Sequence, residues 1–280
     1  MALLALAAPL ALEAQDSISY KNHLYDTFQA SVNFTTVVNR SKARVDGSSG
    51  ILGTTLDFRD ILGLSGTTFQ PALSVRWKPG RHTELDAGVQ FINQSGQRDF
   101  MDTLRVGDDT VSGAISATTK AGSSNAILAF KYTLWAAERH ALGLEIGLGA
   151  AFFSLKMDAT GTACGGPNCA GGTLNVDKSL TGPVGGIGAF GQWRLGNRWY
   201  LGVDARGIGA KVDRYDFSVF QGDVAAEYFL SDRWGLTGGW YYNNVTVKVE
   251  PKSGGSVAND LVGEVVYSYS SLRLGLLGVF

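Results

Sequence analysis

A pair of carboxylates is the first candidate for chemistry in this sequence. Glu84 and Asp86 lie two residues apart in an alternating segment, so their side chains point to the same face of a strand. Two carboxyl groups held together can act as general acid and general base. Ion networks that only stabilise a fold produce the same spacing, and they are the commoner case. We therefore interpret the pair as structural and keep catalysis as the alternative.

The two cysteines are the second candidate. Cys164 and Cys169 enclose the sequence CGGPNC within a polar segment. Two thiols with no histidine nearby make an incomplete metal site, so we predict no metal. In an exported chain the expected state is a disulfide, which across so short a ring stabilises by about 2 kcal/mol and holds a loop tip. No glycine-rich phosphate loop precedes a helix, and we predict no cofactor.

The C-terminal stretch LRLGLLGVF, residues 272–280, indicates the kind of element that positions these groups. Leu272, Leu274 and Leu276 fall on one face, and the chain ends on the aromatic Phe280. This period of two is typical of a strand whose faces meet different surroundings. An apolar strand that ends on an aromatic suits a transmembrane barrel, in which aromatic rings collect at the membrane interface.

Short and long connections alternate along the rest of the chain. Four short turns stand out at 78–81, 136–140, 195–198 and 230–233, and longer polar segments separate them at 41–66, 95–122, 157–179, 211–216 and 249–260. The alternation predicts an all-β fold, a single up-and-down antiparallel transmembrane β-barrel of ten strands, with eight or twelve as alternatives. The predicted strands are 26–39, 67–78, 82–94, 123–135, 140–156, 180–194, 198–210, 217–230, 233–248 and 261–280.

Composition supports a barrel and excludes other classes. The net charge is −1 and charged residues make up 18%, so nothing suggests nucleic acid as a partner. Mean hydropathy is +0.03, which fits alternating strands better than membrane helices. Residues 1–14 form an apolar run that we interpret as a signal peptide. No basic residue precedes the run, which is the pattern expected of a signal peptide with a truncated start. The barrel would then occupy 15–280.

The tryptophans indicate which rim of the barrel carries an aromatic girdle. Five of the six indoles fall within a few residues of a short turn, and Phe280 joins them. Amphipathic rings favour the membrane interface, where the ring body is apolar and the N–H stays wet. The predicted girdle consists of Trp77, Trp135, Trp193, Trp199, Trp234 and Phe280. Trp135 is off the outward parity of its strand, which a β-bulge would explain.

The opposite strand faces carry a balanced set of charges that would lie in the lumen. Seven acids face five bases, which predicts a packed ionic core or a narrow wet passage in a barrel of this size. The predicted network consists of Arg76, Glu84, Asp86, Lys131, Glu145, Arg194, Asp204, Arg206, Asp223, Glu227, Glu264 and Arg273. Placing Glu264 and Arg273 on one face requires a bulge near Ser270 and Ser271.

Small residues gather on one wall, at Gly143, Gly147, Gly149, Ala151, Gly186 and Gly188. All of them face inward on the predicted parity. Removing side chains leaves room for a second segment of chain. We expect part of residues 50–66 to fold into the mouth against this wall.

Several segments carry a resemblance to a known group of proteins. TTLDFRDILGL (54–64), TTFQPALSVRW (67–77), GRH (80–82) and the stretch 215–242 resemble a widespread set of poorly characterised bacterial outer-membrane β-barrel proteins. The broader likeness is to small OmpA- or OmpW-type barrels. It implies a bacterial outer-membrane location, and the barrel topology predicts periplasmic termini and extracellular long loops. The resemblance also implies three partners, which are outer-membrane lipid, lipopolysaccharide and the barrel-assembly machinery. This machinery would recognise the C-terminal strand that ends at Phe280.

We predict a non-enzymatic barrel that is structural or forms a narrow passage for small solutes. An enzyme with a site at the extracellular rim, acting on lipid or peptide, is the first alternative. It is disfavoured because His23, His82 and His140 all fall near the short turns. A soluble lipocalin-like ligand-binding barrel is the second alternative, and it would need an apolar lumen. The sequence indicates no oligomeric state.

Overall fold

The computed structural model describes residues 21–46, 52–64, 67–106, 109–165, 168–250 and 263–280. Ten long strands form a ring in which each pairs antiparallel with the next, and β1 pairs with β12 to close it. The predicted ten-stranded up-and-down barrel is therefore confirmed. The expected signal peptide, residues 1–14, lies outside the described residues and stays a prediction.

The ring consists of β1 (Phe28–Asn39), β4 (Thr67–Gly80), β5 (Thr83–Val106), β6 (Asp109–Ala136), β7 (His140–Gly165), β8 (Asn168–Arg194), β9 (Trp199–Val212), β10 (Tyr215–Phe229), β11 (Trp234–Val249) and β12 (Gly263–Val279). Two short strands, β2 (Lys42–Val45) and β3 (Leu56–Asp57), extend the sheet beside the start of β12. A short 3-10 helix, η1 (His23–Tyr25), precedes β1.

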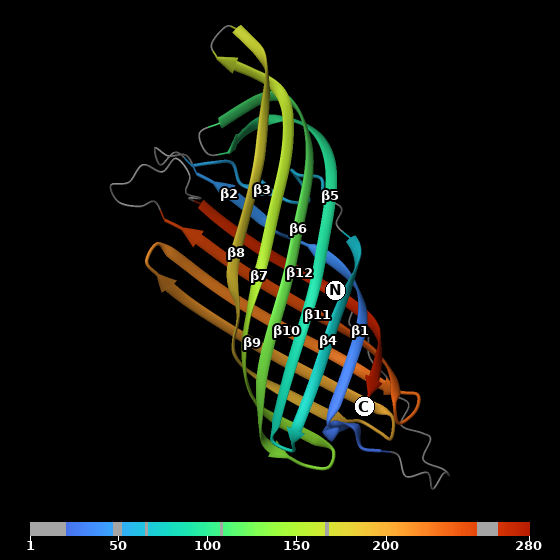
Figure 1. Ribbon diagram of the computed structural model, residues 1–280. Helices are drawn as coiled ribbons and strands as arrows, with labels where there is room; N and C mark the ends of the chain where they lie inside the picture. Colours follow the sequence, from blue (N-terminus) through green and yellow to red (C-terminus); the bar gives the residue numbers. More distant parts are fainter. Residues whose placement is uncertain (1–20, 47–51, 65–66, 107–108, 166–167, 251–262) are drawn as a thin grey trace, which may run out of the picture.

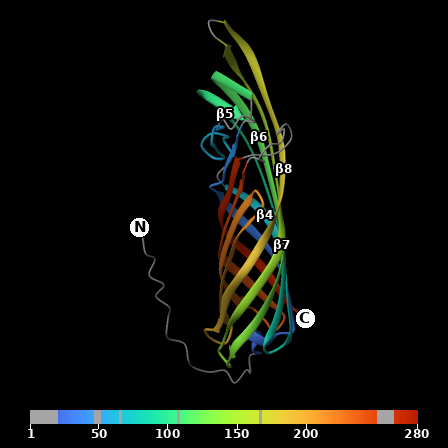
Figure 2. The same cartoon turned by 90° about the vertical axis from the view of Figure 1, so that its left-hand side faces the viewer.

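The two ends of the barrel differ. The start of β1, the end of β12 and the four predicted short turns share one end, which we call the short-turn end. At the opposite, long-loop end, β5 to β8 rise well beyond the tilted strands β9 to β12, and we call this rising part the extension (Figures 1 and 2).

The extension corrects the predicted loops. Segments 95–122 and 157–179 are predicted as loops, yet their described residues form the upper parts of β5 to β8. Their outward face carries Ser, Thr, Lys and Asp, whereas their inward face carries small or apolar residues such as Ile115 and Met157. These segments look like polar loops in the sequence because only one face of each strand is packed, and the other face carries Ser and Thr. Segment 211–216 is also no loop, since only Asp213 and Arg214 connect β9 to β10.

Prolines mark the places where the extension separates from its neighbours. Pairing of β4 with β5 stops at Ala72 opposite Gln90, and Pro71 follows immediately. Pairing of β8 with β9 stops at Ile187 opposite Gly207, and Pro183 lies just beyond. Because proline has no backbone N–H to donate to a ladder, it suits strand segments that have lost one neighbour.

Strand β12 corrects the predicted bulge at Ser270 and Ser271. Its register with β1 and with β11 is continuous. Val265, Tyr267 and Tyr269 therefore point inward together with Arg273, and they are buried. The bulge had been inferred by assuming that apolar residues face outward along the whole strand, but the lumen is apolar near the long-loop end.

Large apolar side chains cover the outside of the ring. Leu73, Phe130, Leu148, Ile187 and Leu274 are all exposed. Beside β7, β6 shows a register shift between Thr133 and Trp135, so Leu134 and Trp135 both reach the outside. This is the bulge that the parity of Trp135 had suggested.

Candidate functional site

The centre of the lumen holds an ion network around Lys131 on β6. Its Nζ atom lies 2.8 Å from Asp86 Oδ2 and 3.5 Å from Glu84 Oε1, both on β5, and 3.9 Å from Glu145 Oε2 on β7. Antiparallel register puts Lys131 opposite both Glu84 and Glu145. The pair Glu84 and Asp86 is thus held by a shared cation.

Two cations from β4 extend this network toward the short-turn end. Arg76 lies 3.5 Å from Glu84 and 3.3 Å from Glu227 across the lumen. Lys78 Nζ lies 2.9 Å from Glu84 Oε2 and also donates to Gln192 Oε1 at 2.9 Å. Lys78 is absent from the predicted network because it is the residue at which the predicted strand 67–78 meets the turn 78–81. Its parity with Arg76 could have identified it.

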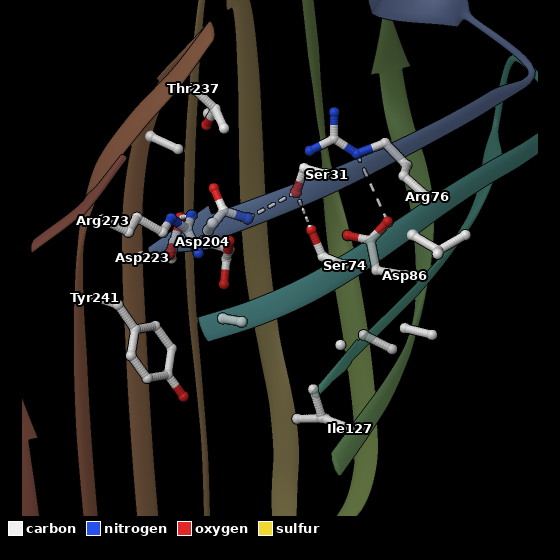
Figure 3. A pocket seen from close by; sticks show the side chains of 18 of the residues that line it. Ser31, Ser74, Arg76, Asp86, Ile127, Asp204, Asp223, Thr237, Tyr241 and Arg273 are labelled. Atoms are coloured by element: carbon white, nitrogen blue, oxygen red, sulfur yellow. Dashed lines mark hydrogen bonds and ion pairs between the residues drawn. The ribbon is translucent and has the colours of Figure 1, made fainter. Parts of the chain in front are cut away.

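A second group of charges lies on the other side of the lumen. Arg206 on β9 lies 3.5 Å from Glu145 and donates from Nε to Gln221 Oε1 at 2.9 Å. Arg273 on β12 forms an ion pair with Asp223 on β10. Figure 3 shows Arg76 and Asp86 on one side of a cavity, with Asp223, Arg273 and Tyr241 on the other.

The cavity between the two groups has a volume of about 220 Å³. Hydroxyl and amide groups of β1 and β4 contribute to its wall, including Ser31, which hydrogen-bonds Ser74 at 2.6 Å and accepts from Asn33 at 2.8 Å. Four bases and four acids line it, so it favours water or a neutral polar molecule over an ion of one sign. The charged lining residues are Arg76, Lys131, Arg206, Arg273, Asp86, Asp204, Asp223 and Glu227.

Two members of the predicted network lie elsewhere. Glu264 points to the outside of β12 and forms an ion pair with Lys248 at 3.7 Å, which corrects its lumenal assignment. The error follows from the bulge that β12 lacks. Arg194 lies at the short-turn rim, where its Nε donates to the Gly196 carbonyl at 3.1 Å, and makes no ion pair with the lumenal group among the described residues.

The N-terminal segment packs into the short-turn end of the lumen. Leu24 is buried with Tyr200, Phe229 and Leu277, and the His23 ring stacks on Phe229 at 3.6 Å. Asp26 is almost completely buried, with Lys21 Nζ at 2.7 Å and His23 Nδ1 within hydrogen-bonding distance. Burial raises the pKa of Asp26, but these two partners outweigh it and hold the pKa below its usual value. We call residues 21–27 the plug.

A layer of apolar side chains and tyrosines packs inside the lumen above the cavity. Val37, Ile92, Val184, Val219, Val245, Tyr267 and Tyr269 form it. Beyond this layer, Leu56, Phe58, Leu62 and Leu64 of the first long connection pack on the inward face of the extension, against Leu104, Ile115, Leu155 and Met157. Side chains therefore occupy the lumen on both sides of the cavity.

The resembling segment 54–64 owes its shape to two residues. Asp57 Oδ1 accepts hydrogen bonds from the N–H groups of Arg59 and Asp60, both at 3.0 Å, which forms a tight turn. Gly63 has a φ of +61°. A Cβ atom added to Gly96 would lie only 2.0 Å from the carbonyl oxygen of Gly63, so only glycine fits at position 96. The turn and the close approach to Gly96 on β5 bring the leucines of the segment onto the extension.

Contrary to expectation, residues 54–64 do not pack against the wall of small residues that contains Gly147 and Gly188. A Cβ on Gly147 would lie 3.2 Å from Arg206 Cδ, so the space belongs to the arginine that pairs with Glu145. A Cβ on Gly188 would lie 2.1 Å from the Ala205 carbonyl oxygen, which means that β8 and β9 approach too closely for a side chain there.

The predicted girdle residues lie at the short-turn end. Trp77, Trp135, Trp199, Trp234 and Phe280 are exposed there, and Trp193 is partly exposed. Cys164 and Cys169 face each other as partners in the hairpin between β7 and β8, the arrangement that a cross-strand disulfide needs. Their side chains lie outside the described part, so the disulfide stays a prediction.

The three histidines lie at or near the short-turn end. His23 and Asp26 form a buried pair in the plug, and His82 and His140 flank short turns. Within the described residues, no group of three or more His, Cys, Asp or Glu side chains could hold a metal ion. No helix in this part of the chain is long and apolar enough to cross a membrane.

Comparisons with known proteins identify the fold. No protein-family model and no curated protein matches the sequence. Among solved structures, the outer membrane protease OmpT from Escherichia coli is similar, with a TM-score of 0.56, 14% identity and coverage of 95% of this chain and 99% of that chain. A Pseudomonas aeruginosa FadL homologue is similar at 10% identity and a TM-score of 0.39, covering 91% of each chain.

The outer membrane protein OprG from Pseudomonas aeruginosa is similar at 11% identity and a TM-score of 0.37, covering 91% of this chain and 96% of that chain. This likeness and that to the FadL homologue are too weak to argue from, and the likeness to OmpT concerns the fold alone. The chain thus has the fold of outer-membrane β-barrel proteins.

Proposed function

We propose that the protein is an integral protein of the bacterial outer membrane with a closed lumen, serving as a non-enzymatic structural scaffold. In this proposal the short-turn end faces the periplasm and the extension faces the cell exterior. Phe280, exposed at the end of β12, would present the C-terminal strand to the assembly machinery.

The closure of the lumen on both sides of the cavity carries this proposal. Leu24 and its aromatic neighbours fill the short-turn end, and the layer around Tyr269 fills the other side. Between them the bases and acids pair with each other instead of lining an open path. A constitutive pore would need a continuous polar channel, which a ten-stranded ring filled by side chains does not offer.

The outward faces support a membrane location over the lipocalin-like alternative. Leu148 is 71% exposed and Leu274 is 73% exposed, and both belong to runs of alternating apolar residues. Water would strongly disfavour such a continuous apolar belt, whereas hydrocarbon favours it. The lumen carries the buried charges, the reverse of what an apolar ligand would require.

Among the described residues, no histidine stands at the long-loop end, where the enzymatic alternative would place its site. All three histidines are at or near the short-turn end, and the lumenal carboxylates of Asp86, Glu145 and Asp223 pair with Lys131, Arg206 and Arg273. A narrow gated passage is the better second candidate, because the polar cavity is separated from the short-turn end by a plug of only a few residues.

Planar-bilayer recording tests the proposal. Insertion is verified first by heat-modifiable gel mobility, and the native protein should then show no stepwise current at any voltage. Stable conduction by the native protein would overturn the closed-scaffold proposal. A Leu24→Gly variant removes the central apolar contact of the plug. Brief openings in this variant alone would favour the gated passage, and continued silence would support the scaffold.

A further inference from the structure

The extension has two long edges, and the described chain covers only one of them. Along β5, the Thr54 N–H donates to the Arg105 carbonyl at 2.9 Å, and Leu64 forms a β-bridge with Gly96. Along β8, pairing with β9 begins only at Ile187. Above that point, no strand among the described residues lies on the side of β8 that faces away from β7. Figure 1 shows β8 at the border of the extension, above the place where β9 tilts away.

The backbone groups on this open side belong to alternate residues of β8. The register of β8 with β7 is continuous along the whole hairpin. In the same register, the Arg194 N–H donates to the Arg139 carbonyl at 2.7 Å, so the even-numbered residues of β8 bond toward β7. The N–H and C=O groups of the odd-numbered residues therefore point to the open side. We call the following six exposed residues the free edge: Gly171, Thr173, Asn175, Asp177, Ser179 and Thr181.

The free edge lies where the outer face of the wall is polar. Thr181 stands opposite the exposed Phe152, the last large apolar side chain on this face of β7, whereas Asp177 stands opposite Lys156. Unpaired backbone groups are very costly in hydrocarbon, but water can solvate them. From Gly171 to Thr181 the edge spans about 34 Å of strand, which is enough to pair with a complete second strand.

Lys178 gives the free edge a charge preference. It shares the inward face of β8 with Leu174 and Val176, which are buried. Lys178 itself is exposed and makes no ion pair with a described residue. A lysine in this position disfavours an apolar partner strand, which would bury the charge unpaired. A strand with a carboxylate opposite Lys178 would neutralise the charge.

A second copy of this chain fits the free edge poorly. Two copies in one membrane would be related by a twofold axis along the membrane normal. The upper part of β8 rises along the barrel axis (Figure 1). Each N–H group of the free edge would then face the same N–H group of the other copy, and no ladder of hydrogen bonds could form. A strand of another polypeptide has no such restriction.

We propose that the free edge binds an extended segment of another polypeptide, which adds to the extension as an antiparallel strand. This segment would carry an acidic residue opposite Lys178 and an apolar residue opposite Val176. Main-chain hydrogen bonds would supply the affinity, and the side-chain pattern would supply the specificity. The interaction goes beyond the scaffold function proposed above and does not depend on whether the lumen is closed.

A synthetic peptide that copies residues 152–161 of β7 tests the proposal, because these residues already pair with the other side of β8 in a known register. A Leu155→Glu form of the peptide places a carboxylate opposite Lys178. Fluorescence anisotropy measures the binding of each labelled peptide to the refolded full-length protein in detergent. Lys178→Gln should weaken binding of the Leu155→Glu peptide about threefold, and it should not weaken binding of the unchanged peptide. Equal loss for both peptides would overturn the proposal.

N-methylation of the peptide tests the main-chain pairing without changing the protein. Methyl groups on the backbone nitrogens of positions 154, 156 and 158 would block the N–H groups that face the free edge, because these positions stand opposite its odd-numbered residues. Methyl groups at 155, 157 and 159 would point away from it. The first peptide should bind at least about tenfold more weakly than the second. Equal binding of the two peptides would contradict strand addition.

Asn175→Pro tests the same contact from the side of the protein. It removes one N–H of the free edge, and Asn175→Ala is the matched control that keeps this N–H. Pro183 already occupies an odd-numbered position of β8, so proline on this parity breaks no bond to β7. Heat-modifiable gel mobility verifies that both variants are folded.

Asn175→Pro should bind the Leu155→Glu peptide at least about tenfold more weakly, and Asn175→Ala should bind it within about twofold of the native protein. Binding by Asn175→Pro at the native level, or no binding by the native protein, would overturn the proposal. Native dimers in detergent that Asn175→Pro dissociates would also overturn it, and they would assign the free edge to a second copy of the chain.

Discussion

Lys131 holds Asp86 at 2.8 Å across the seam between β5 and β6, and the same ammonium group reaches Glu84 and Glu145. Replacing it by Met would leave the buried carboxylates of Glu84 and Glu145 and the half-buried carboxylate of Asp86 without their common cation. Removing one partner of a buried ion pair typically lowers stability by about 3–5 kcal/mol. We expect Lys131→Met to lower the free energy of unfolding by that amount, measured by urea unfolding in lipid vesicles with tryptophan fluorescence.

Arg194→Gln is the control for this experiment. Arg194 has the inward parity of the network but lies at the exposed rim. Its replacement should change the free energy of unfolding by no more than about 0.5 kcal/mol. Similar effects of the two substitutions would mean that the lumenal charges act as solvated ions and not as a packed network.

The plug should loosen in acid because of Asp26. The partners Lys21 and His23 hold the pKa of Asp26 below its usual 3.8, so the folded protein binds this proton more weakly than the unfolded chain does. The stability contributed by the carboxylate is therefore complete above the unfolded pKa and is lost as pH falls through the folded pKa.

Asp26→Asn isolates this effect from other titrations. The difference in unfolding free energy between the native protein and Asp26→Asn should be largest above about pH 5 and should shrink as pH falls below 3.8. The urea midpoint of both proteins across this range measures it. A difference that stays constant with pH would show that Asp26 is not held by its partners.

Ring closure and the number of strands could be predicted because they depend on a pattern that the membrane imposes. Leu85, Leu144 and Leu274 all belong to period-two runs, and tryptophans follow the short turns. The extension escaped prediction because its outer face is polar, with residues such as Thr118 and Asp158. Along these strands polar residues alternate with small apolar residues. The difference in hydropathy between the two faces is therefore too small to distinguish the strand from a loop in the sequence.

The site was predictable only where parity was continuous. Arg76, Glu84 and Lys131 follow from alternation within single strands, and the structure brings them together. Glu264 was misplaced because Tyr267 and Tyr269 were assumed to face lipid. The plug could not be found from alternation, since His23 and Asp26 precede β1 and meet the lumen through folding of an irregular segment.

Cys164 and Cys169 should form a disulfide at the tip of the β7–β8 hairpin. They are cross-strand partners, so the backbone already holds them close. Alkylation of the unfolded protein followed by mass spectrometry should label neither residue before reduction and both residues after it. A Cys164→Ser, Cys169→Ser variant should lose about 2 kcal/mol at most, because the closed ring is short. Labelling without reductant would show that the thiols are free.

The apolar belt on β7 should respond to charge according to depth. Leu148 is 71% exposed among other apolar side chains, and Ser154 lies six residues further toward the long-loop end on the same face. An arginine facing hydrocarbon destabilises a barrel by about 2–4 kcal/mol near the midplane and by much less near the interface. Leu148→Arg should therefore lower the free energy of unfolding in lipid vesicles strongly, whereas Ser154→Arg should leave it within about 1 kcal/mol. If water and not lipid surrounded this wall, Leu148→Arg would be as mild as Ser154→Arg, and the protein would have to be a soluble barrel.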